Sequence, residues 1–115
     1  METMSDYTIF CTREQTYKAI ELGAPITKDA GAGFRYEEFP NPTAEQMIGW
    51  LRGKGVSAKA NALSWDDEHN YAPFFQVHEI KSRRELLFGW RKSYEEATLA
   101  AIDAALDYLE QQTKQ

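Results

Sequence analysis

A chain of 115 residues with a formal net charge of −5 is long enough for one domain, and it is too acidic for generic electrostatic binding to nucleic acid. Its single cysteine, Cys11, excludes an internal disulfide and favours a reducing compartment. The sequence shows neither an N-terminal apolar leader nor an apolar run of about 18 residues, so we expect a cytoplasmic protein that does not enter a membrane.

The first 40 residues predict an arm with one strand and one helix. Tyr7 to Cys11 is a short β-prone run. Thr12 and Gln15 then form a capping box, which predicts a helix from Arg13 to Leu22. Gly23 suits the position just beyond a helix end.

A second helix is predicted after Pro42. Thr43 and Gln46 repeat the capping-box pattern, and Gly53 and Gly55 end the helix. Its apolar positions recur at helical spacing: Ala44, Met47, Ile48 and Leu51.

Three strands are expected next, separated by a polar, acidic turn over residues 65–70 and a charged hairpin tip over residues 81–85. They run over Val56 to Leu63, Tyr71 to Ile80 and Leu86 to Lys92. Proline lacks a ladder donor, so Pro73 confines its part of the second strand to a start or an edge. Alternation places Leu86, Phe88 and Trp90 on one face of the third strand.

The last helix is predicted from Ser93 to Gln112, with Ser93 and Glu96 as a third capping box. One face of it is apolar over Thr98, Leu99, Ile102, Ala105, Leu106 and Leu109. Glu96, Asp103 and Asp107 lie opposite that face and are expected to be in solvent, which indicates a long helix with its apolar side on a broad apolar surface.

These elements predict a single α+β domain. Residues 41–115 form a unit of α-β-β-β-α order, a three-stranded antiparallel sheet with two helices packed on one face, and residues 1–40 form a strand and helix arm packed on that unit. The other face of the sheet is expected to show several apolar side chains: Leu63, Trp65, Phe74, His78, Ile80 and Leu87. A face this apolar needs a cover, so we expect the N-terminal segment to shield it, with another chain as the alternative.

Three segments carry a resemblance to a known group of proteins: FCTREQTYKAIELGAPI over residues 10–26, PTAEQMIGWLRGKG over 42–55 and SYEEATLAAIDAALDYL over 93–109. In these segments the chain resembles small uncharacterised proteins carried by phages and mobile elements of gut bacteria. The resemblance implies a mobile-element origin and no known activity.

The helix–strand–strand–strand–helix order is also similar to that of the double-stranded RNA-binding domain. That family holds phosphates with lysines at the start of its last helix, where this chain has Glu95 and Glu96. It reaches the minor groove with a histidine, whereas His69 here follows three acidic residues. The resemblance therefore implies the fold and not the function.

Catalytic and metal-binding interpretations are weak. His78 has no nucleophile motif near it in the sequence, and Cys11 has no C-x-x-C partner, so we interpret them as a strand histidine and an inert thiol. The cluster of Asp66, Asp67, Glu68 and His69 is interpreted as a solvated turn, because neighbouring residues in a turn rarely converge on one metal. We expect no enzyme activity and no cofactor.

Two binding hypotheses remain. The first is a non-enzymatic accessory or protein-interaction protein that docks an unknown partner, or a second copy of itself, on the apolar sheet face through Leu63, Trp65, Phe74, His78 and Ile80. The alternative is a nucleic-acid-binding module that uses the only basic concentration, Lys81, Arg83, Arg84, Arg91 and Lys92, with Trp90 beside it. The overall charge favours the first hypothesis.

Overall fold

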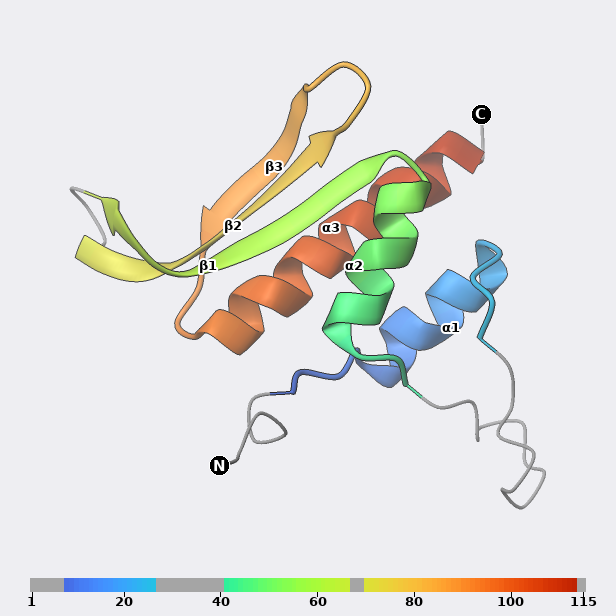
Figure 1. The fold of residues 1–115 in the computed structure, drawn as a ribbon, viewed down its shortest axis with the longest axis horizontal. Helices are drawn as coiled ribbons and strands as arrows, with labels where there is room; N and C mark the ends of the chain where they lie inside the picture. Colours follow the sequence, from blue (N-terminus) through green and yellow to red (C-terminus); the bar gives the residue numbers. More distant parts are fainter. Residues whose placement is uncertain (1–7, 27–40, 67–69, 114–115) are drawn as a thin grey trace.

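The computed structural model of the chain describes residues 8–26, 41–66 and 70–113 (Figure 1). Its elements are three helices and a three-stranded antiparallel sheet, which confirms the predicted α+β class. In chain order they are α1 (Arg13–Glu21), α2 (Ala44–Gly53), β1 (Val56–Asp66), β2 (Asn70–Glu79), β3 (Glu85–Trp90) and α3 (Tyr94–Thr113). None of the described helices is both long enough and apolar enough to cross a membrane.

Helix starts are where the sequence is most informative. Thr12 and Gln15 exchange hydrogen bonds of 3.1 and 3.0 Å at the start of α1, and Thr43 and Gln46 do the same at the start of α2. Both predicted capping boxes are therefore confirmed. At α3 the Ser93 hydroxyl accepts from the Glu96 N–H at 3.0 Å.

The start of α3 differs from the prediction in one contact. Glu96 does not return its side chain to Ser93 but accepts from the backbone N–H of Lys92 at 3.3 Å. This third capping box is thus displaced by one residue, and Glu96 joins the helix start to the end of β3.

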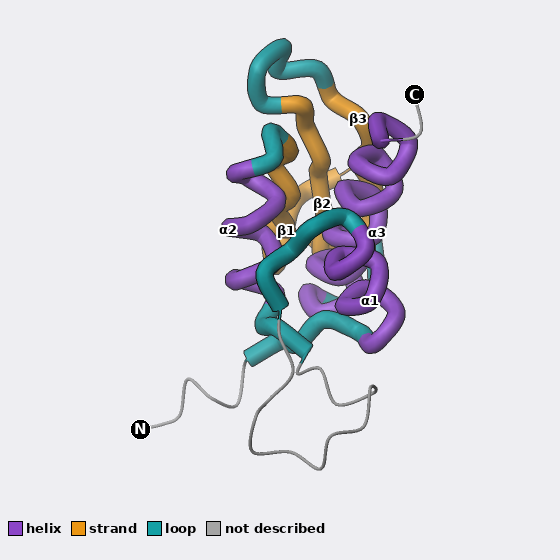
Figure 2. Tube along the Cα trace, turned by 90° about the vertical axis from the view of Figure 1, so that its right-hand side faces the viewer, coloured by secondary structure: helices purple, strands orange, loops and turns teal. Residues whose placement is uncertain are grey.

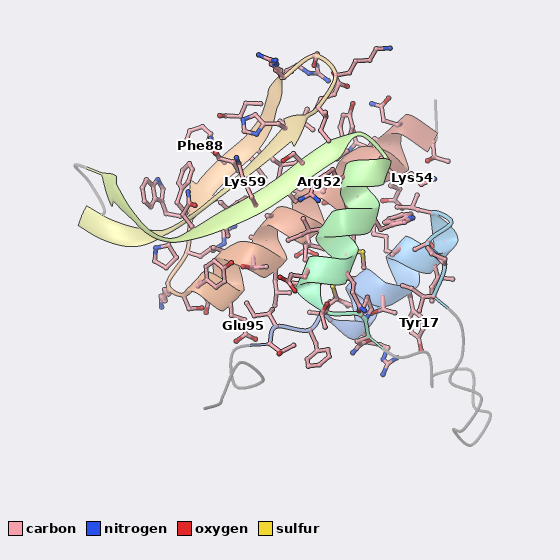
Figure 3. The ribbon with its side chains drawn as sticks, in the orientation of Figure 1. Tyr17, Arg52, Lys54, Lys59, Phe88 and Glu95 are labelled. Atoms are coloured by element: carbon pink, nitrogen blue, oxygen red, sulfur yellow. The ribbon has the colours of Figure 1, made fainter. Side chains whose placement is uncertain are left out.

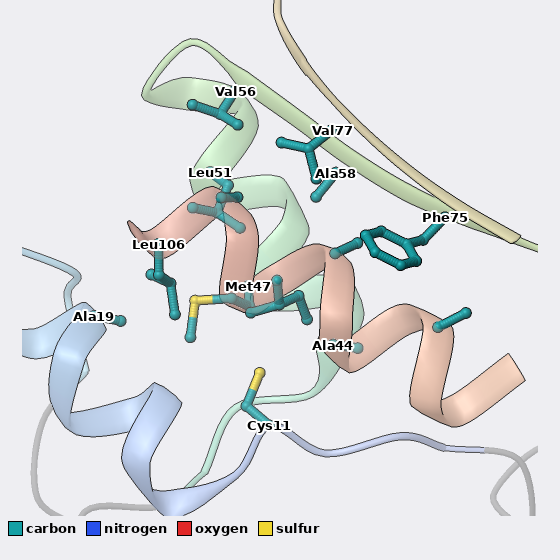
Figure 4. Packing of buried hydrophobic residues seen from close by; sticks show 14 residues of the cluster. Cys11, Ala19, Ala44, Met47, Leu51, Val56, Ala58, Phe75, Val77 and Leu106 are labelled. Carbon is teal, nitrogen blue, oxygen red and sulfur yellow. The ribbon is translucent and has the colours of Figure 1, made fainter. Parts of the chain in front are cut away.

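The core lies between the sheet and helices α2 and α3. Val56, Ala58, Phe75 and Val77 point from β1 and β2 toward α2 and α3 (Figure 4). Met47 and Leu51 from α2, and Ile102 and Leu106 from α3, close this core. Small side chains at Ala97, Ala101 and Ala105 let α3 lie close to the strands.

The N-terminal arm lies on the helical side of the molecule. Helix α1 contacts α3 and none of the strands, and Figure 2 shows it beyond α3 as seen from the sheet. Two backbone bonds join the arm to the start of α2, from Cys11 N–H to Pro42 C=O at 2.9 Å and from Ala44 N–H to Ile9 C=O at 2.7 Å. The expectation that this arm shields the far face of the sheet is therefore wrong for its described part, residues 8–26.

Polar contacts explain why the arm prefers the helices. The buried amide of Gln15 donates to the Leu99 carbonyl at 2.9 Å and to the Asp103 carboxylate at 2.7 Å. Lys18 pairs with Asp107 and, at 3.0 Å, with Glu110. The acidic face of α3, interpreted from the sequence as solvent-exposed, is thus partly used to hold α1.

Two irregularities in the sheet were not predicted. The first lies between Asn61 and Ser64 of β1, opposite Pro73. Pro73 therefore sits inside the central strand where the ladder is already interrupted, rather than at a strand start or an edge.

The second irregularity is a bulge in β3. Val77 pairs with Leu87 but His78 pairs with Glu85, so Leu86 is the extra residue. The bulge reverses the predicted alternation beyond it. Leu86 packs against the core, whereas Phe88 and Trp90 lie on the opposite face of the sheet, so their placement beside Leu86 was wrong.

Candidate binding surface

We call the face of the sheet opposite α2 and α3 the open face. Because cross-strand partners share a face, the register defines it in three rows. The rows are Ser57–His78–Glu85, Lys59–Gln76–Phe88 and Asn61–Phe74–Trp90. Within residues 8–26, 41–66 and 70–113, no helix packs on these rows.

Three aromatic side chains form a cluster on the open face. The Phe74 ring centroid lies 4.7 Å from that of Trp90 and 6.0 Å from that of Phe88, with interplanar angles of 57° and 43°. Phe88 keeps 55% of its surface exposed. The Phe74 ring is therefore tilted against the other two rings rather than stacked on them.

Gly89 explains why the cluster forms on this side. It faces Phe75 on the core side of the sheet, where a Cβ atom would lie 2.9 Å from the Phe75 Cε1 atom. The buried Phe75 ring takes the space that a side chain at position 89 would need. The aromatic side chains that flank Gly89, Phe88 and Trp90, consequently point outward.

Polar side chains surround the cluster. Lys59 and Asn61 are exposed on β1, while Gln76 and His78 are half-buried on β2 (Figure 3 labels Lys59 and Phe88, from the two edge strands). Glu85 is the one carboxylate in the three rows. The open face therefore combines π surfaces, side-chain amides and a lysine, with no aliphatic side chain among its nine positions.

The structure separates the predicted interface residues. Phe74 and His78 lie on the open face, and Ile80 lies in the turn just beyond β2, 41% exposed. Leu87 pairs with Val77 and so belongs to the rim of the helical face instead. The side chains of Leu63 and Trp65 fall outside the part of the chain that the structure describes.

The predicted basic residues do not form one patch. Lys81, Arg83 and Arg84 lie at the hairpin tip, whereas Arg91 and Lys92 follow the far end of β3 (Figure 1). Six strand residues separate the two groups, a distance of roughly 20 Å. Arg91 also turns to the helical side, where its guanidinium lies 5.0 Å from the centroid of the Phe75 ring.

The hairpin tip is fixed to α3 by a small network. Glu79 accepts hydrogen bonds from the hydroxyls of Ser82 and Tyr108 and lies 3.8 Å from Arg84. These contacts, first that of Ser82 and then that of Tyr108, lower the pKa of Glu79. The network holds the tip in place and leaves Lys81 and Arg83 exposed.

The catalytic candidates are not assembled into a site. Burial, with a smaller contribution from Asp103, raises the pKa of the Cys11 thiol to about 11, so at neutral pH it is not a thiolate. His78 stands between Ser57 and Glu85 on the open face. His69 and the acidic residues beside it, Asp67 and Glu68, lie outside the described residues.

The described residues also offer no metal centre. Among them no three His, Cys, Asp or Glu side chains gather as a metal site would require. A hollow of about 510 Å³ lies between residues 24–26 and α2. Its described lining holds Asn41, Gln46 and Trp50 but no acid, base or nucleophile.

Comparison of the chain with protein-family models, with curated proteins and with solved structures gives no match. The open face is therefore interpreted from its own chemistry.

Proposed function

We propose that this chain is a non-enzymatic binding protein and that the open face of its sheet is the contact surface. The observation that carries the proposal is the cluster of Phe74, Phe88 and Trp90 on that face, in which Phe88 is exposed and the other two rings are half-buried. Exposed aromatic side chains that lie together, with a polar rim, are typical of contact surfaces. The resemblance of the three helical segments to proteins of phages and mobile elements supports an accessory role on such an element.

The rest of the molecule supports a binding role by its rigidity. Helices α2 and α3 back the sheet with a closely packed core, and α1 is held to α3 through Gln15 and Lys18. A rigid support lets the open face meet a partner without losing conformational entropy. Binding through aromatic rings, side-chain amides and a lysine requires no change in the protonation or covalent bonding of any side chain on this face.

Site-specific photo-crosslinking tests the proposal. A photoreactive phenylalanine analogue replaces Gln76, at the centre of the open face, in cells that carry the gene. A matched control carries the same side chain at Gln111, on the exposed side of α3. We expect an adduct from position 76 that is absent from position 111 and is lost when Phe88 is also replaced by Ser.

The nature of the adduct is informative as well. Digestion by protease or by nuclease identifies the chemical class of the partner. Absence of any adduct from position 76, or equal adducts from both positions, contradicts the proposal.

A further inference from the structure

We infer that the partner of the open face is a single-stranded nucleic acid, whose bases stack on the aromatic cluster and whose phosphates meet the cations of the sheet. This inference rests on the proposed function, since it assigns the partner of the same face. Three features of the described residues carry it: the rings, the distribution of charge and the composition of the three rows.

The rings suit base stacking. Sheet surfaces that hold single strands do so by stacking successive bases on exposed aromatic side chains. Phe88 is 55% exposed, and Phe74 and Trp90 adjoin it on neighbouring strand positions of the same face. Asn61 and Gln76 lie in the adjacent positions of the rows, where their amides can donate to and accept from base edges.

The formal net charge of −5 is not evenly distributed along the chain. Residues 56–92, which run from the start of β1 to the start of α3, hold six of the thirteen basic residues and five of the eighteen acidic ones. Three of those five acids, Asp66, Asp67 and Glu68, are consecutive in the sequence, so Glu79 and Glu85 are the acids of the rest of this segment. Helices α1, α2 and α3 hold eight acidic and three basic residues, so the negative charge of the described residues lies mainly in the helical layer.

The cations of the sheet bracket the aromatic cluster. Lys59 lies on the open face in the row of Phe88. Lys81 and Arg83 are exposed at one end of β3, and Lys92 is exposed at the other. A chain of phosphates crossing the rings along β3 meets positive charge at both ends, with Lys59 two strands away across the sheet, while Glu85 is the acid it must pass.

The composition of the rows argues against a protein partner. The centre of a protein–protein interface is depleted in lysine and charged groups. The open face instead carries an exposed lysine, Lys59, in the row of Phe88, and it has no Val, Leu, Ile or Met in its three rows. A second copy of the chain fits no better, because two such faces would bring the same cations together.

Fluorescence anisotropy with purified protein tests the inference. The probes are labelled oligothymidine and oligouridine of about 12 nucleotides, with a duplex of equal length as comparison. We expect binding of the single strands in about 50 mM salt, weaker binding of the duplex, and affinity that falls as salt rises.

Variants of Phe88 separate stacking from simple apolar contact. F88L keeps an apolar side chain but removes the π face, and we expect it to weaken binding by about 5- to 150-fold. F88Y keeps the ring and should bind like the original chain. F10A is the matched control, because Phe10 is 56% exposed and lies outside the open face.

Variants of lysine test the phosphate contact. K59Q should reduce the slope of log affinity against log salt by about 0.7, the contribution of one phosphate to single-strand binding. K54Q, a change of the same charge at the end of α2, should leave the slope unchanged.

Failure of this inference is distinguishable from failure of the proposed function. No anisotropy change with any probe, or equal affinity of F88L and the original chain, overturns the nucleic-acid partner. A position-76 adduct that protease removes and nuclease does not would then leave the binding face in place with a protein partner. Loss of that adduct as well would overturn both.

Discussion

Replacing Gly89 by alanine tests the packing that turns the aromatic cluster outward. A Cβ atom at position 89 would lie 2.9 Å from Cε1 and 3.2 Å from Cζ of Phe75. Carbon atoms at optimal separation are about 3.5–4.0 Å apart, so the ring must move by several tenths of an ångström. Phe75 is 1% exposed and is packed within the core, which leaves it little room.

Overpacking of this kind costs about 1–3 kcal/mol of unfolding free energy. Chemical denaturation of the purified variant measures that cost. The matched control is G49A in α2, where a Cβ meets nothing within 4 Å. Because alanine favours a helix over glycine, G49A should stabilise the protein by up to about 1 kcal/mol.

A second substitution isolates the contact. In an F75L background the shorter side chain leaves room for the new methyl group, so G89A should lose most of its cost. The two changes would then be non-additive, as expected for neighbours in direct contact. The reasoning is refuted if G89A is as stable as the original chain, or if its cost is the same in the F75L background.

Three further predictions concern the helical layer and the hairpin. Q15E places a carboxylate against the Asp103 carboxylate, so it should cost about 1–3 kcal/mol at neutral pH and recover as the pH falls toward 4, measured by denaturation across pH. Cys11, with a pKa of about 11, should resist a thiol reagent at pH 8 until the protein unfolds. The stabilisation of the folded state that comes from this raised pKa is complete below pH 9, and it is lost as the pH rises toward 11. S82A should raise the pKa of Glu79 in a carboxyl NMR titration, since Ser82 contributes most to lowering it; the stability from the lowered pKa is present at neutral pH and lost as acid protonates the carboxylate.

Local sequence signals account for the elements of the fold. Capping residues such as Thr12 and Thr43, and glycines with positive φ such as Gly23 and Gly55, mark helix ends through contacts within a few residues. These contacts do not depend on the rest of the chain, so a reader of the sequence can place them. The apolar stripes of α2 and α3 were predictable for the same reason.

The side chains of β3 were not predictable, because their direction depends on pairing between strands. Strict alternation would put Leu86 and Phe88 on the same face, but the bulge at Leu86 separates them. The reason lies across the sheet, where the Phe75 ring occupies the space beside Gly89. A glycine between two aromatic residues was the only local signal of this arrangement.

The position of the arm was also beyond sequence reasoning. Residues 1–40 were expected to cover the apolar face of the sheet, but the described part of the arm packs on α3. The decisive contacts join residues far apart in the chain, such as Gln15 with Leu99 and Lys18 with Glu110. Acids on α3 that were interpreted as a solvated face therefore served as partners.

An NMR titration with oligothymidine tests directly whether the open face of the sheet binds a single strand. The indole N–H signals of Trp90 and Trp50 serve as paired probes, the first on the open face and the second on α2. If bases stack on the open face, the NMR signals of the Trp90 indole and of the Gln76 side-chain amide shift progressively, while the signal of the Trp50 indole does not move. Shifts confined to the helices, or a spectrum that does not change, would contradict it.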